Sequence, residues 1–177
     1  MDLQELLNVD GGDNNAGLAI NIYIARASTV LTWPTVTANP TTFAERVTIT
    51  DPVVFKTDGR FYKVQCIVEK NGLQSLAQGE VGSKSTENIL TFRRKGITKE
   101  SLGLFEEFKN DDLVVVVPDL EGDHRILGTV DLPATLSEFE ASTGEAVADH
   151  KHSMFKIRSV GAAAPFYEGA ISETPAV

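Results

Sequence analysis

The residues whose side chains could do chemistry gather at only a few places in the chain. His150 and His152 stand two residues apart, beside Asp149. On a strand, two such histidines would face the same side and could hold a metal ion. No cysteine and no third histidine lies near them in the sequence. We therefore expect two exposed loop histidines here rather than a metal site.

Two other places invite a similar test. Segment 119–123, Asp-Leu-Glu-Gly-Asp, carries calcium-loop carboxylates but lacks the 12-residue spacing and closing Glu of a helix-flanked site. It is more typical of a hairpin turn whose carboxylates face water. Cys66 lies among apolar residues of an expected strand, which predicts a buried thiol rather than a reactive thiolate.

Motifs of catalysis are absent from the rest of the sequence. There is no Gly-x-Ser-x-Gly nucleophile motif and no glycine-rich phosphate loop. The paired carboxylates Glu106-Glu107 and Asp111-Asp112 are adjacent, so on a regular element they point apart and favour a solvated face. The sequence thus predicts no catalytic residue, no cofactor and no metal ligand, and we expect a protein that is not an enzyme.

Composition indicates one domain with its own core. The 177 residues are 42% hydrophobic and 23% charged, and they include a single cysteine, so no internal disulfide can form. No apolar run approaches the roughly 20 residues of a membrane helix. The first residues lack the basic and apolar regions of a secretory signal. We expect synthesis and folding inside the cell, without membrane contact.

The net charge of −9 is unevenly distributed along the chain. It is −3 over residues 1–43, +4 over 44–99, −11 over 100–149 and +1 over 150–177. The acidic excess argues against tight binding of nucleic acid, because phosphate contacts need clustered Lys and Arg. The basic and acidic stretches could pair within the fold, or meet on neighbouring copies in a head-to-tail contact.

Residue patterns predict a mainly β fold, with strands joined by turns. Residues 1–17 are rich in Gly and Asn and are expected to form an N-terminal arm. Apolar residues alternate from Leu18 to Ile24, which predicts a strand with one buried face. Residues 28–42 are rich in Thr and Pro and favour an extended loop. Further strands are expected at 47–50, 53–55, 60–69, 73–81, 88–94, 113–117, 125–130 and 153–160.

Turns and one helix complete the prediction. Asn71-Gly72 favours a tight hairpin between 60–69 and 73–81, and residues 118–123 are expected to join a second hairpin. A helix is expected over about 98–109, with Thr98 as its cap. Segment 132–148 is ambiguous and allows a short helix. We therefore expect one β-sandwich or barrel-like domain over 18–160 with a flanking α-helix, followed by an extended tail over 161–177.

This order of elements resembles the tail tube proteins of long-tailed bacteriophages. The resemblance also rests on the strings 109–118 (Lys-Asn-Asp-Asp-Leu-Val-Val-Val-Val-Pro), 125–128 (Arg-Ile-Leu-Gly), 143–144 (Thr-Gly) and 165–169 (Pro-Phe-Tyr-Glu-Gly). It covers most of the chain as architecture, and none of the strings is diagnostic. It implies a virion structural protein that forms homohexameric rings, stacked head to tail into a tube that conducts DNA within the viral tail. The implied partners are copies of the chain and other virion proteins, and DNA would pass without being tightly held.

The tube hypothesis assigns roles to particular side chains. Sheets joining edge to edge would bury strand edges, with strand 18–24 in the wall. Aromatic residues outside strands and apolar residues of that strand are candidates for contacts between subunits: Trp33, Phe166, Tyr167, Ile20 and Ile22. Carboxylates are candidates for an acidic lumen or stacking face: Glu106, Glu107, Asp111, Asp112, Asp119, Glu121 and Asp123.

Three alternatives remain open at this point. A head-completion, connector or capsid-decorating protein of a phage also uses small β-sandwiches with arms. A β-sandwich module that binds carbohydrate or peptide would show several exposed aromatic residues, whereas most of the 13 here lie in strand or helix patterns. A hydrolase would need a metal or a nucleophile pair, for which only residues 149–152 offer a start.

Overall fold

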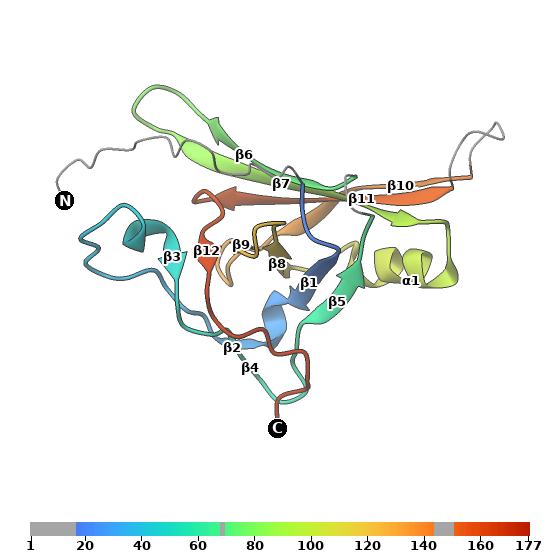
Figure 1. The fold of residues 1–177 in the computed structure, drawn as a ribbon, viewed down its shortest axis with the longest axis horizontal. Coiled ribbons are helices and arrows are strands. Elements are labelled where there is room, and N and C mark those ends of the chain that lie inside the picture. Colours follow the sequence, from blue (N-terminus) through green and yellow to red (C-terminus); the bar gives the residue numbers. More distant parts are fainter. Residues whose placement is uncertain (1–16, 68–69, 144–150) are drawn as a thin grey trace.

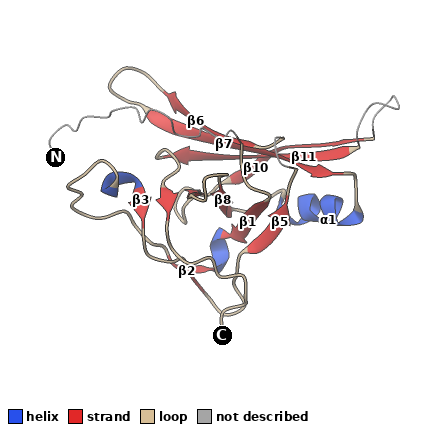
Figure 2. Cartoon of the chain, in the orientation of Figure 1, coloured by secondary structure: helices blue, strands red, loops and turns tan. Residues whose placement is uncertain are grey.

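The protein is mainly β, with one α-helix at an end of the molecule (Figures 1 and 2). The computed structural model describes residues 17–67, 70–143 and 151–177. Of these residues, 45% lie in strands and 11% are helical. This confirms the expected fold class, and the strands divide into two main sheets that pack face to face.

The larger sheet has six strands and is built around a buried central one. In spatial order it contains β3 (Thr48–Ile49), β12 (Phe166–Tyr167), β9 (His124–Leu127), β8 (Leu113–Pro118), β1 (Asn21–Arg26) and β5 (Tyr62–Gln65). All pairings are antiparallel except that of β3 with β12. Every residue of β8 is buried, because both faces of the sheet are covered there.

The smaller sheet has four antiparallel strands. Its order is β10 (Thr135–Ser142), β11 (His152–Gly161), β7 (Ser85–Lys95) and β6 (Gly72–Gln78). A short ladder of β2 (Val30–Thr32) with β4 (Val54–Phe55) and two 3-10 turns, Ala27–Thr29 and Glu45–Val47, complete the described elements. Residues 28–42 therefore begin with a turn and a short strand, and the rest is loop as expected.

The core between the two sheets follows from the two-residue period of the strands. Ile22 and Ile24 of β1 point toward Phe92 of β7 and toward Phe155 and Ile157 of β11, and all five are buried. Phe92 and Phe155 stack with ring centroids 5.1 Å apart. The predicted alternation of strand 18–24 fails at one position, because Ile20 precedes β1 and is 47% exposed.

A second apolar cluster covers the other face of the larger sheet. Val114 and Val116 of β8 and Ile126 of β9 pack there against Phe55 and Phe61. The segments that close this cluster come from residues 27–61 and from the end of the chain. The valine run is thus buried by two different layers, which explains why β8 carries no polar side chain.

The C-terminal segment belongs to the packed domain. The backbone N–H of Phe61 donates to the carbonyl of Ser172 at 2.9 Å, and Ala176 exchanges hydrogen bonds with the loop at Asp58 and Gly59. The segment expected as a tail, residues 161–177, therefore contacts the domain expected over 18–160. Apart from β12 the segment is extended, as predicted, but it wraps over its own domain and is not a free tail.

Helix α1 (Lys99–Phe108) forms as the sequence predicts. The Thr98 hydroxyl accepts a hydrogen bond from the N–H of Ser101 at 3.1 Å and so caps the first turn. Phe105 and Phe108 face the core, and the Phe105 ring stacks on Phe139 of β10 at 4.4 Å. The helix therefore closes one end of the sandwich (Figure 1).

The hairpin expected at Asn71-Gly72 is wrong. β5 pairs with β1 in the larger sheet, whereas β6 pairs with β7 in the smaller one, so the chain crosses between sheets at this point. The Asn71 side chain accepts from the N–H of Leu18 and donates to the Leu18 carbonyl, both at 3.1 Å. Asn71 therefore fastens the crossover instead of forming a two-residue turn.

Segment 132–148, which allows a short helix by its sequence, contains the strand β10. Its helix-like spacing has a structural cause: the β10–β11 register shifts between Leu136 and Glu138. This bulge at Ser137 lets Leu136 and Phe139, three residues apart, both pack on the core. The hairpin of β8 with β9 and the strand predicted at 153–160 are confirmed.

Candidate assembly surfaces

The chemistry-bearing residues singled out in the sequence lie in separate elements in the part of the chain that the structure describes. Within it, no group of three or more His, Cys, Asp or Glu side chains could hold a metal ion. His152 begins β11, while Asp149 and His150 lie outside the described residues. The Asp119 carboxylate accepts from the N–H groups of Glu121 and Asp123, at 2.9 and 3.0 Å, so it shapes the β8–β9 turn.

Cys66 is a packed thiol. Its Sγ lies 3.3 Å from the carbonyl of Ile20, and the Asn71 amide donates to it at 3.1 Å. Burial raises the pKa of this thiol, which opposes formation of the thiolate. The environment therefore favours a structural role at the junction of β5 with the start of the described chain.

The seven candidate carboxylates do not form one face. One group lies on α1 and just before β8, and the other lies in the turn just after β8. β8 has six residues, so the two groups are separated by about 20 Å along the strand. The seven side chains therefore lie in two separate groups at opposite ends of β8.

The first carboxylate group holds the helix to the sheet. The Arg26 guanidinium at the end of β1 pairs with both Glu107 and Asp111, and these carboxylates raise the pKa of Arg26. The same guanidinium lies 5.6 Å from the centre of the Phe108 ring. Glu106 also pairs with Lys109 on the same helix. Three of the four carboxylates of this group are therefore engaged within the chain.

The five apolar contact candidates divide between core and surface. Ile22 is 0% exposed and Tyr167 is buried, with the Tyr167 hydroxyl donating to the carbonyl of Ala170 and accepting from the N–H of Val53 at 3.0 Å. Neither has surface to offer a neighbour, because both side chains are used inside the domain. Phe166 lies beneath the Arg125 guanidinium, 4.5 Å from the ring centre. Ile20 is exposed, and Trp33 is half-buried.

The sequence predicted the strand at 73–81, but not that it forms an exposed edge of a sheet. β6 is an edge strand, and five of its seven residues are exposed. Its sequence, Gly-Leu-Gln-Ser-Leu-Ala-Gln, has no charge and no proline, the devices that normally protect a sheet edge. The sequence shows that these protective residues are missing. Because the strand was expected to pair with residues 60–69, it was not recognised as an unprotected edge.

The same sheet has a second edge at β10 and an open outer face. Because neighbouring strands alternate in direction, β6 and β10 run in opposite directions. On the outer face, Lys156 of β11 pairs with Glu138 of β10 at 2.6 Å, and Arg158 pairs with Glu87 of β7. The cations of this face are thus partly neutralised by carboxylates of adjacent strands.

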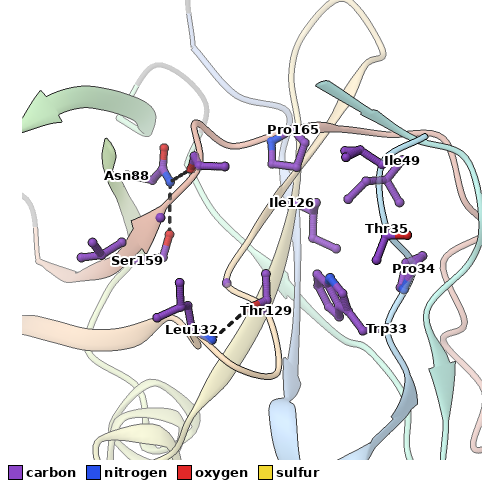
Figure 3. A pocket seen from close by; sticks show the side chains of 15 residues that line it. Trp33, Pro34, Thr35, Ile49, Asn88, Ile126, Thr129, Leu132, Ser159 and Pro165 are labelled. Carbon is purple, nitrogen blue, oxygen red and sulfur yellow. Dashed lines mark hydrogen bonds between the residues drawn. The ribbon is translucent and has the colours of Figure 1, made fainter. Parts of the chain in front are cut away.

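A third surface is an apolar groove of about 240 Å³ beside the ends of β9 and β11 (Figure 3). Trp33 and Pro34 lie on one side, Leu132 lies on the other, and Ile126 lies between them; Val160 also lines the groove. This groove was not predicted from the sequence, because its lining residues come from five separate segments of the chain.

Comparison of the chain with models of protein families, with curated proteins and with solved structures found no match. Among the described residues, no helix has both the length and the apolar character needed to cross a membrane. The surfaces above are therefore interpreted from their own geometry.

Proposed function

We propose that this protein is a structural virion subunit that assembles into rings, stacked as the tail tube of a bacteriophage. The observation that carries the proposal is the pair of open edges, β6 and β10, on one four-stranded sheet. The resemblance of the sequence to tail tube proteins supports the same assembly, with six copies in each ring and DNA passing through.

The two edges are suited to a head-to-tail junction. A rotation that carries one subunit onto the next keeps the direction of every strand, so β6 would meet a neighbour's β10 antiparallel. That junction continues the alternation already present in the sheet. Because the two edges differ, the contact is heterologous, and a closing rotation produces a ring. Closure would remove the exposed edges altogether.

The bulk of the subunit sets which face of the ring lies inside. The larger sheet and α1 lie on one side of the four-stranded sheet (Figure 1). A closed ring has more room outside, so we place the open face of the four-stranded sheet toward the lumen. Lys156, Arg158, Glu87 and Glu138 would line it as two ion pairs, which would weaken the attraction of these two cations for phosphate.

This arrangement changes the role proposed for the acidic residues. Both carboxylate groups flank β8, in the layer away from the open face of the smaller sheet. We therefore assign Asp112, Glu121 and Asp123 to candidate contacts between rings or with other virion proteins, not to the lumen. Contacts of this kind weaken with salt, because exposed charges are screened.

Negative-stain electron microscopy of the full chain, over a series of protein and salt concentrations, tests the proposal. We expect rings or hollow tubes at high protein concentration, and separation of tubes into rings at high salt. A chain that stays monomeric at every concentration would contradict it.

A matched pair of substitutions tests the junction itself. Leu76 on β6 and Leu102 on α1 are 42% and 43% exposed, so Leu76→Glu and Leu102→Glu make the same change on different surfaces. Leu76→Glu should reduce assembly several-fold, because it faces carboxylates of a neighbour's β10. Adding Glu140→Lys should restore assembly, and Leu102→Glu should leave it unchanged. Equal loss in both single variants would overturn the β6–β10 junction.

A further inference from the structure

The chemistry of the groove selects an apolar occupant. Its main polar side chain, Asn88, is fully used: it donates to the carbonyl of Ala162 at 2.8 Å and accepts from the Ser75 hydroxyl and the Ala164 N–H. The Thr129 hydroxyl accepts from the N–H of Leu132 at 2.9 Å. A sugar or nucleotide would find few free partners here, whereas aliphatic side chains would bury apolar surface.

The rim of the groove is apolar as well. Leu132 is 55% exposed, and Val36 and Val160 are also exposed. Together with the half-buried Trp33 they form a continuous apolar lining (Figure 3). About eight water molecules would fill a space of this volume, and an apolar side chain that displaced them would gain free energy.

The N-terminal sequence supplies a matching segment. Residues 3–9, Leu-Gln-Glu-Leu-Leu-Asn-Val, hold four large apolar side chains among seven residues. They precede the described part of the chain, which begins at Gly17. Residues 10–16, rich in Gly, Asn and Asp, join the two.

The point where the described chain begins makes the groove reachable. Leu18 pairs with Asp119 and the N–H of Ala19 donates to Pro118, so the chain starts beside the β8–β9 turn. β9 runs from that turn to Gly128, which lines the groove. Its four residues span about 13 Å, whereas seven extended linker residues reach about 23 Å.

We propose that residues 3–9 dock in this groove of their own chain and cover its apolar rim. The inference goes beyond the proposed function and does not depend on ring assembly. Docking in the same molecule would keep the groove covered in the unassembled subunit. An uncovered groove would be an exposed apolar patch that favours aggregation.

Trp33 is the only tryptophan and reports on the groove directly. In the full chain, Leu6→Ser with Leu7→Ser should shift Trp33 fluorescence to longer wavelength and increase its quenching by acrylamide. The matched control, Gln4→Ser with Asn8→Ser, should change neither. Both spectra should be independent of protein concentration, because the contact is within one chain.

Two results would overturn the inference. One is an unchanged Trp33 spectrum in the leucine variant, which would show that the segment does not cover the groove. The other is a spectrum that depends on concentration, which would assign the groove to a second copy. Because dilute monomer is used, failure here is distinguishable from failure to form rings, which microscopy scores separately.

Discussion

β8 and β6 are both uncharged strands, yet they occupy opposite environments. All six residues of β8 are buried, between β1 and β9 and between two apolar clusters. β6 lies at the edge of its sheet and is mostly exposed. In β8 charge is absent because burying an unpaired charge is costly. In β6 no such cost applies, so the missing charge supports the proposal that this edge pairs with another chain.

The comparison separates folding from association. β8 is held on every side within one chain, so its contacts determine the stability of the subunit. β6 contributes little burial, so its outward surface is available to a partner. Substitutions in the two strands should therefore affect different measurements, and three predictions follow in order of expected size.

The largest effect is expected from truncation in the core strand. Leu113→Ala at the start of β8 should lower the free energy of unfolding by about 2–5 kcal/mol, because it leaves a cavity beneath both sheets. Leu76→Ala in β6 should change it by less than about 0.5 kcal/mol. Chemical denaturation of the monomer measures both. If both variants lost a similar amount of unfolding free energy, the difference proposed between β8 and β6 would be wrong.

Two glycines give the next largest difference. A Cβ at Gly128 would lie 2.6 Å from the backbone N of Ala134 and 2.7 Å from the carbonyl O of Leu113, and its φ is +78°. Gly128→Ala should therefore cost about 2–4 kcal/mol. Gly82, in the β6–β7 turn, has φ +87° but open space around it, so Gly82→Ala should cost about 1 kcal/mol. Thermal or urea unfolding that ranks them in the opposite order would contradict the packing described around β8.

The smallest effect is expected on the stability of the protein at acid pH, through Glu100 in the first turn of α1. Hydrogen bonds from its own backbone N–H and from the Thr98 hydroxyl lower the pKa of Glu100. Its stabilisation is therefore present above the unfolded pKa and is lost as pH falls through the lower folded value. Glu100→Gln should flatten the pH dependence of unfolding at acid pH without altering assembly through β6. A pH profile identical to that of the natural chain would remove this role.

Local patterns allowed part of the fold to be predicted. The Thr98 cap and the spacing of Phe105 and Phe108 indicate α1, and the valine run before Pro118 indicates a buried strand. These features depend on residues close in sequence. The β8–β9 hairpin belongs to the same class, since its turn lies between its strands.

Other features depended on distant contacts. Asn71-Gly72 has the sequence of a hairpin turn. In the structure, however, Asn71 forms hydrogen bonds with Leu18 where the chain crosses from one sheet to the other. The bulge at Ser137 gave β10 a helical spacing. The buried position of Tyr167 also depends on loop segments far from the tail. The candidate surfaces could therefore be predicted only in part from the sequence. Trp33 was identified as a candidate contact, but the open edges of β6 and β10 could be recognised only once the strand order was known.

The central claim is that β6 and β10 are the edges through which subunits associate, and hydrogen exchange measured across a protein concentration series tests it most directly. Amides of β8 should be protected at every concentration, because the monomer already buries them. In β6 and β10, the alternate amides that point away from the neighbouring strand should exchange quickly in dilute protein and become protected as rings form. Rings that form while β6 and β10 remain unprotected would contradict the account.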